Sequence, residues 1–222
     1  MTLDPAAHAG HGDHPPRVGF FTDTSVCIGC KACEVACKEW NGVPSTFDGG
    51  DGLDFLAGSY DNTGQLGADT WRHVAFIEQD RRVPPAGGPK EDGPPEDGQG
   101  GFRWLMSSDV CKHCTSAACL EVCPTGALFR TEFGTVVVQD EVCNGCGYCV
   151  PACPYGVIDR RERDGGAHKC TLCYDRLKVG MEPACAKACP TDSIQFGELE
   201  TLRARAGRRV EQLHEAGVSQ AR

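Results

Sequence analysis

Short apolar segments of alternating or continuous type run along the chain, and they predict strands rather than long helices. The segments expected to form strands are residues 18–23, 71–77, 102–106 and 193–196. Residues 127–139 predict a hairpin, because the turn signal Phe133-Gly134 lies between two apolar runs. The pattern is that of an α+β protein built from short elements.

Two segments have helical periodicity. Residues 32–40 predict a short helix. Residues 199–222 are expected to form a C-terminal amphipathic helix that docks on this protein or on a partner, with a position on a membrane surface as the less favoured alternative. Its apolar side chains stand at helical spacing among many charged residues, namely Leu199, Leu202, Ala206, Val210 and Leu213.

Three segments lack an apolar pattern and separate the other parts of the chain. Residues 1–17 are rich in Gly, Pro, His and Asp and predict a flexible arm, in which His8, His11 and His14 form only a weak metal motif. A Gly/Asp-rich insertion continues to about residue 69, and residues 84–101 predict a Pro/Gly-rich linker.

All sixteen cysteines fall into four groups of four. Groups one and three share the spacing C-x2-C-x2-C-x3-C, whereas groups two and four lengthen only the middle interval. The groups are Cys27, Cys30, Cys33 and Cys37; Cys111, Cys114, Cys119 and Cys123; Cys143, Cys146, Cys149 and Cys153; and Cys170, Cys173, Cys185 and Cys189. Because the shared spacing is that of ferredoxins, the chain is expected to hold four [4Fe-4S] clusters with all sixteen cysteines as iron ligands.

The residues around the cysteines fit this chemistry. Each iron of a cluster needs a thiolate at a different corner, and two-residue steps let the backbone curl around the cluster. Gly29, Gly145 and Gly147 suit such turns, because glycine has no Cβ and adopts positive φ readily. A proline follows the last cysteine of groups two, three and four, where it ends the preceding helical turn.

The fourth cysteine of one group ligates the other cluster in two-cluster ferredoxins. Only a short segment separates groups two and three, so we expect them to pair, which leaves groups one and four to pair around them. The predicted ligand sets are Cys27, Cys30, Cys33 and Cys189 for cluster 1; Cys170, Cys173, Cys185 and Cys37 for cluster 2; Cys111, Cys114, Cys119 and Cys153 for cluster 3; and Cys143, Cys146, Cys149 and Cys123 for cluster 4. The predicted fold is α+β with two ferredoxin-like 2[4Fe-4S] modules, an inner one (102–159) nested within an outer one (18–83 and 160–198).

Other uses of cysteine fit less well. Disulfides need an oxidising compartment, and no charged and then apolar leader precedes Cys27. Zinc sites more often have two separated C-x2-C pairs, so a zinc-stabilised scaffold is the remote alternative. Covalent haem is not indicated, because no C-x-x-C-H motif occurs.

Charge and composition narrow the choice of function. The 222 residues carry a formal net charge of −9, to which four clusters with their thiolates would add about −8, so the basic footprint of nucleic-acid binding is missing. The ordinary apolar core is modest, so we expect the metal-free chain to be largely unfolded. Four lysines follow or precede ligands, where they either tune the clusters or are ordinary solvated side chains: Lys31, Lys38, Lys112 and Lys169.

Motifs for substrate chemistry are missing from the sequence. It contains neither a dinucleotide-binding G-x-G-x-x-G after a strand nor a phosphate-binding G-x-x-x-x-G-K-[ST], and no cysteine is left over as a nucleophile. No segment approaches the ~20 apolar residues of a membrane span. We therefore expect no catalytic residue in this chain and an electron-transfer role. Membrane contact is expected only through a partner or through residues beyond Arg222.

The cysteine framework resembles that of the iron-sulfur subunits of molybdenum or tungsten oxidoreductases, most closely the β subunit of respiratory formate dehydrogenase. The resemblance covers about residues 18–215 and is carried by GFFTDTSVCIGCKACEVACKEWN at 19–41, NGCGYCVPACPY at 144–155, KCTLCYDR at 169–176 and EPACAKACP at 182–190. It implies a role in anaerobic respiration, in which a catalytic partner with a pterin-bound Mo or W oxidises formate and passes electrons to cluster 1.

The resemblance also implies a terminal acceptor, either a quinone-linked membrane cytochrome b or a soluble protein. Association with a membrane through a partner and a soluble cytoplasmic complex both remain open, as does the side of the membrane. The equivalent subunit of a nitrate, sulfoxide or polysulfide reductase, or of a hydrogenase, is the alternative, because it would keep the same cysteines and change only the partner.

Overall fold

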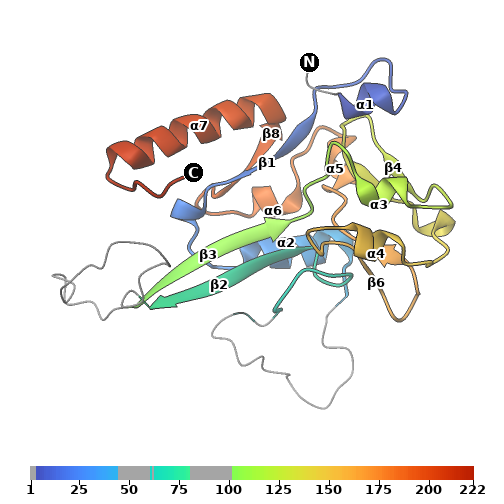
Figure 1. Ribbon diagram of the computed structural model, residues 1–222, viewed down its shortest axis with the longest axis horizontal. Helices are drawn as coiled ribbons and strands as arrows, with labels where there is room; N and C mark the ends of the chain where they lie inside the picture. The colour runs from blue at the N-terminus through green and yellow to red at the C-terminus, as the bar shows by residue number, and fades with distance from the viewer. Residues whose placement is uncertain (1–3, 45–60, 62, 81–101) are drawn as a thin grey trace, which may run out of the picture.

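The computed structural model describes residues 4–44, 61, 63–80 and 102–222. Within these residues the strands form antiparallel pairs rather than one large sheet (Figure 1). The pairs are β1 (Val18–Thr22) with β8 (Ile194–Glu198), β2 (Arg72–Asp80) with β3 (Phe102–Val110), β4 (Leu128–Arg130) with β5 (Val136–Val138), and β6 (Asp159–Arg160) with β7 (Ala167–His168). The linker expected at 84–101 and most of the insertion before residue 69 lie outside the described residues.

The β1–β8 pair joins the two ends of the chain. Val18 lies opposite Glu198 and Thr22 opposite Ile194, so the register runs over the whole of both strands. Phe20 and Phe196 stand directly opposite and their rings meet edge to face, with centroids 6.0 Å apart. This pairing brings cysteine group one, which follows β1, next to group four, which precedes β8.

Strands β2 and β3 form one long ribbon (Figure 1), with Arg72 opposite Val110 and Phe76 opposite Met106. The sequence pattern predicted both strands but placed them in different modules, with the inner module beginning at residue 102. The two strands satisfy each other's backbone hydrogen bonds, which neither could do alone. The first strand of the proposed inner module is therefore bound to a strand of the outer one.

The hairpin predicted at 127–139 is confirmed by β4 and β5. Leu128 pairs with Val138, and the turn closes where Gly134 has a φ of +71° and donates its N–H to the carbonyl of Thr131. Glycine is favoured at this position because residues with a side chain rarely adopt positive φ.

Helices near the cysteines are mostly single turns. The exception is α2 (Ala32–Asn41), which carries Cys33 and Cys37 and ends at the left-handed Gly42. The short ones are α3 (Ala118–Glu121), α4 (Cys149–Ala152), α5 (Tyr174–Leu177) and α6 (Ala184–Lys187). Two 3-10 turns, η1 (Thr24–Val26) and η2 (Asp140–Val142), lead into groups one and three in the same way.

The N-terminal segment differs from the flexible arm expected at 1–17. Residues 5–8 form the short helix α1 (Pro5–His8), begun by the side chain of Asp4, and Ala6 is buried. The ring of His11 hydrogen-bonds the carbonyl of Arg130 at 3.0 Å. Contacts with β4 thus fix a segment whose composition alone suggested no structure.

The C-terminal helix α7 (Leu199–Glu215) lies beside β1 and β8 (Figure 1). Leu202 is its buried residue, and Leu199 lies over Gly19 of β1. Arg209 anchors the far part of the helix by an ion pair with Asp23 at 2.7 Å. None of the helices in the described ranges combines the length and the apolar character that crossing a membrane requires.

Asp23 also holds the turn that precedes group one. Burial alone would raise the pKa of Asp23, but hydrogen bonds from Ser25 and Arg209 outweigh it and leave the pKa below its usual value. A carboxyl whose pKa is lowered on folding contributes stability above its unfolded pKa and loses it as the pH falls through the folded value. The Asp23–Arg209 contact is therefore intact at neutral pH.

Replacing Arg209 should loosen α7. The substitution Arg209→Ala removes a partly exposed ion pair and is expected to cost about 1 kcal/mol, which lowers Tm by about 2–4 °C in a protein of this size. Amide hydrogen exchange should rise in α7 and β1. Arg208→Ala, at an exposed neighbouring position, is the control and should change stability by less than about 0.5 kcal/mol; equal effects of both variants would contradict the anchoring role.

Candidate metal centres

One cavity lies between groups one and four. Its sulfur lining consists of Cys27, Cys30, Cys33 and Cys189. The remaining walls combine apolar and polar side chains, among them Val74 of β2 and Ile194 of β8, and Ser108 of β3 lies 3.8 Å from the sulfur of Cys33. Three cysteines of one group and the last cysteine of another thus surround a single space.

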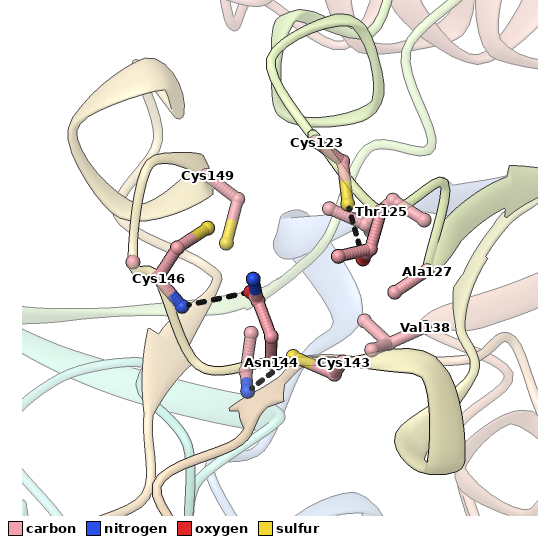
Figure 2. Close-up of a pocket in the computed structure, with 11 residues that line it drawn as sticks. Cys123, Thr125, Ala127, Val138, Cys143, Asn144, Cys146 and Cys149 are labelled. Carbon is pink, nitrogen blue, oxygen red and sulfur yellow. Dashed lines mark hydrogen bonds between the residues drawn. The ribbon is translucent and has the colours of Figure 1, made fainter.

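A second cavity, also lined by four cysteines, lies between groups two and three. Figure 2 shows the sulfur atoms of Cys143, Cys146, Cys149 and Cys123 around an open space. The backbone N–H of Ala167 donates to the sulfur of Cys143 at 3.4 Å. A sulfur that accepts such a bond is better able to carry negative charge, as a metal thiolate must.

A third spatial set of cysteines, which come from sequence groups one and four, is buried between α2 and α6. Asn41 donates from its amide to the sulfurs of both Cys37 and Cys173, each at 3.8 Å. Burial raises the pKa of Cys37 to about 12, and the nearby thiols of Cys185 and Cys173 add to the effect. Cys37 therefore faces the cysteines of group four and not only those of its own group.

Cys170 completes this third spatial set. Burial raises its pKa well above the usual value, and among the nearby thiols the largest contributions come from Cys37 and Cys111. Cys170 and Cys111 pack in the same buried cluster, against which Cys153 also lies. The third spatial set of cysteines is thus adjacent to the fourth.

The fourth spatial set contains cysteines of sequence groups two and three. Burial raises the pKa of Cys114, and the thiols of Cys111 and Cys153 raise it further. Burial also raises the pKa of Cys119, although the ammonium of Lys169 opposes the rise. Cys111, Cys114 and Cys119 therefore share their surroundings with Cys153, the last cysteine of the other group.

The first two cysteines of every group enclose a residue in the left-handed conformation. These residues are Gly29 (φ +65°), His113 (+44°), Gly145 (+69°) and Leu172 (+57°). The sequence predicted the two glycines but gave no sign of His113 and Leu172, because non-glycine residues rarely adopt this conformation. Both are buried and both donate their backbone N–H to the sulfur two residues earlier. Packing thus imposes on them the turn that glycine adopts freely.

A second repeated turn follows the prolines. Three residues after the last cysteine of groups two, three and four stand Gly126, Gly156 and Asp192, all with positive φ. Each donates its N–H to the carbonyl of that cysteine at 3.4 Å. The proline therefore turns the chain immediately after the ligand, as its sequence position indicated.

The four lysines next to cysteines differ from one another. Lys112 is largely exposed and pairs with Asp109. Lys38 donates to the carbonyls of Pro44 and Asp69, and burial lowers its pKa. Lys169 is almost fully buried and donates to the carbonyls of Val136 and Cys170. Of the two interpretations left open by the sequence, the solvated one fails for Lys169 and holds for Lys112.

Lys31 and its neighbours form a polar network at α2. Its ammonium lies 3.3 Å from Glu34 and 3.4 Å from Asp61, and His73 lies 3.2 Å from Asp61. Glu34 also accepts the backbone N–H of Val74, which ties α2 to β2. The network fixes the helix that carries Cys33 and Cys37.

The donor sets fit iron-sulfur clusters. Each collects four thiol sulfurs, two of the sets line cavities, and backbone or amide N–H groups donate to sulfur in at least three sets. Within the described ranges no three His, Cys, Asp or Glu side chains converge as ligands of a single ion would. A four-iron cluster occupies space between its ligands, so its cysteines need not converge in that way.

Comparison with known proteins agrees with this chemistry. Residues 26–127 and 102–199 each match a 4Fe-4S dicluster domain. The chain is 38% identical to the iron-sulfur subunit of the nitrate-inducible formate dehydrogenase of Escherichia coli over 94% of its length and 64% of the relative. It is 36% identical to the B subunit of the anaerobic dimethyl sulfoxide reductase of the same organism over 86% of its length and 78% of the relative.

The chain therefore belongs to this family of iron-sulfur subunits. The formate dehydrogenase iron-sulfur subunit of Haemophilus influenzae is a further relative, 37% identical over 99% of the chain. The chain spans somewhat less than two thirds of the length of the formate dehydrogenase relatives. With two dicluster domains, the chain carries multiple [4Fe-4S] clusters.

The turn at Gly145 offers a direct test of the cluster-binding loops. A Cβ at Gly145 would overlap the carbonyl oxygen of Gly165, whereas a Cβ at Gly126, which has the same positive φ, would meet nothing within 4 Å. Both alanine variants bear the left-handed penalty of about 1–2 kcal/mol, and Gly145→Ala bears an overpacking cost of about 1–3 kcal/mol in addition. Anaerobic thermal unfolding of the iron-loaded protein measures both costs. Equal destabilisation by the two variants would show that the contact with Gly165 does not matter.

Proposed function

We propose that this chain is the electron-transfer subunit of a formate dehydrogenase and carries four [4Fe-4S] clusters on crossed ligand sets. The observation that carries the proposal is that each cavity is lined by three cysteines of one group and the last cysteine of another. The assignment is Cys27, Cys30, Cys33 and Cys189; Cys170, Cys173, Cys185 and Cys37; Cys111, Cys114, Cys119 and Cys153; and Cys143, Cys146, Cys149 and Cys123.

The nested arrangement of two modules is part of the proposal. The β1–β8 pair and the packing of α2 against α6 support an outer module made from both ends of the chain. The apolar cluster around Leu128, Val136 and Cys149 supports an inner module, because cysteines of groups two and three pack against it. The β2–β3 ribbon supports a shared boundary between the two modules instead of a flexible joint.

The four sites would lie in series. Bound [4Fe-4S] clusters accept and release single electrons. The exposed Cys30 belongs to the first site and the exposed Cys146 to the last, while the second site contains four buried cysteines. Cys33 and Cys37 on one helix link sites one and two, and the contact between Cys170 and Cys111 links sites two and three. The chain would thus offer one accessible site at each end.

The names of the relatives, which are subunits of larger enzymes, support a catalytic partner for this chain. A catalytic subunit with a Mo- or W-bound pterin would oxidise formate and deliver electrons at Cys30, and a membrane cytochrome b or a soluble acceptor would receive them near Cys146. The similarity to the B subunit of dimethyl sulfoxide reductase favours a second candidate, the same conductor in a sulfoxide reductase, where electrons flow the opposite way. Attachment to a membrane would then come through a partner subunit.

Replacing Cys37 tests the crossed ligands. The substitution Cys37→Ser should remove the cluster of Cys170, Cys173 and Cys185 and leave that of Cys27, Cys30 and Cys33, because Cys37 faces group four. Iron analysis should fall by about four of sixteen atoms per chain, and electron paramagnetic resonance of the reduced protein should lose the signal of one cluster. Cys189→Ser is the matched variant and should instead affect the site that contains Cys27. Loss of the Cys27 site in Cys37→Ser would refute the pairing.

Formate tests the partner. The native complex is purified anaerobically, its iron, sulfide, Mo and W are measured, and formate is added while absorbance is followed. About sixteen iron and sixteen sulfide per chain and bleaching by formate are expected. Zinc in place of iron would support the scaffold alternative, and clusters that stay oxidised with formate but are reoxidised by a sulfoxide after chemical reduction would favour the sulfoxide reductase.

A further inference from the structure

Arg72 of β2 is a buried cation with unused donors. Its side chain is 1% exposed, and its guanidinium lies over the ring of Phe20 with 4.7 Å between the guanidinium carbon and the ring centroid. Nη1 donates to the hydroxyl of Ser108 at 2.9 Å. Within the described residues Nε and Nη2 have no hydrogen-bond partner. A buried charge with free donors is strongly destabilising unless another group satisfies it.

Cysteines of two different proposed sites lie near Arg72, because Phe20, which its guanidinium covers, packs against one buried cluster with Cys33 and Cys185 and against another with Cys170. Burial by itself would lower the pKa of Arg72, but the nearby thiols outweigh it and raise the pKa; in order of strength they are Cys185, Cys170, Cys33 and Cys37. Cys33 belongs to the first ligand set and the other three to the second. Arg72 likewise opposes the burial that raises the pKa of Cys33 to about 11.

Nearby carboxylates are already engaged elsewhere. Glu34, the buried acid closest in sequence to these cysteines, accepts the N–H of Val74 and lies beside Lys31 and His73. Ser108, which accepts from Arg72, also contacts the sulfur of Cys33 through the same hydroxyl. The free side of the guanidinium is therefore left for the ligand sets themselves.

We propose that Arg72 is a positioning residue shared by the first and second clusters, whose sulfur atoms accept hydrogen bonds from Nε and Nη2, the two nitrogens of the guanidinium without a partner. This inference rests on the ligand sets proposed above. A reduced cluster carries one more negative charge than an oxidised one, so a fixed cation and N–H donors favour the reduced form and raise the potential. Arginine suits this role because it stays charged and its planar fork donates in two directions.

The first arm of the test removes the charge. The full chain in its anaerobically purified complex is compared with Arg72→Met by redox titration monitored by electron paramagnetic resonance, together with iron analysis. The reduced-to-oxidised ratio of clusters 1 and 2 at a given potential should fall at least tenfold, which is about 59 mV for a one-electron couple, while clusters 3 and 4 stay unchanged. Unshifted potentials with full iron content, or equal shifts in all four clusters, would overturn the inference.

Two further variants separate charge from structure. Arg72→Lys keeps the charge and should restore the ratio to within about threefold of the wild type, and a shift as large as that of Arg72→Met would overturn the role of the charge. Lys112→Met removes an exposed cation next to Cys111. It should change the reduced-to-oxidised ratio of no cluster by more than about twofold at a given potential, because solvent screens the charge. A shift in Lys112→Met equal to that in Arg72→Met would contradict a specific role of the buried site.

The last measurement needs no substitution. Wild-type complex labelled with ¹⁵N-arginine is reduced and studied by pulsed electron paramagnetic resonance, which should detect ¹⁵N coupled to the cluster spin. Absence of that coupling in an iron-replete protein overturns the inference and leaves the proposed function intact. Absence of iron and sulfide from the wild type would overturn both.

Discussion

The backbone hydrogen bonds between β1 and β8 hold together two segments from opposite ends of the chain. Their register, from Val18 opposite Glu198 to Thr22 opposite Ile194, sets Cys27 and Cys189 at the same cavity. The facing rings of Phe20 and Phe196 add an apolar contact to this pair. The helices α2 and α6, which carry cysteines of the outer groups, pack against each other, and α7 lies against both strands. Without this pair the first cavity would have no fourth sulfur.

Several buried sulfurs in this protein could become thiolates only at a desolvation cost that the polypeptide does not offset. Burial raises the pKa of Cys149 to about 11 and that of Cys37 to about 12, so the metal-free side chains are neutral thiols at pH 7. Iron binds thiolates, so loading releases protons and couples binding to folding. The left-handed conformations of His113 and Leu172, each between the first two cysteines of its group, add strain to the metal-free chain. Interactions available only with metal present would balance these costs, which agrees with the small apolar core.

The cysteine spacing carried most of what the sequence alone predicted, because ligand geometry leaves fixed intervals between residues. The strands and the hairpin at 127–139 followed from apolar alternation. The pairing of β2 with β3 did not, since the two strands are far apart in sequence and their register depends on tertiary packing. Arg72 gave no local signal, because an arginine in a strand is ordinary until its burial is known. The contact of Asn41 with the sulfur of Cys37 could have been predicted, because residues four apart on a helix lie on the same face.

The central claim is that each cluster takes three cysteines from one group and one from another. Diffraction at the iron absorption edge from anaerobically grown crystals of the full chain locates every iron directly. The account predicts four separate four-iron peaks, with the sulfur of Cys189 at the peak bounded by Cys27, Cys30 and Cys33, and that of Cys37 at the peak bounded by Cys170, Cys173 and Cys185. A peak bounded by Cys27, Cys30, Cys33 and Cys37 would contradict it.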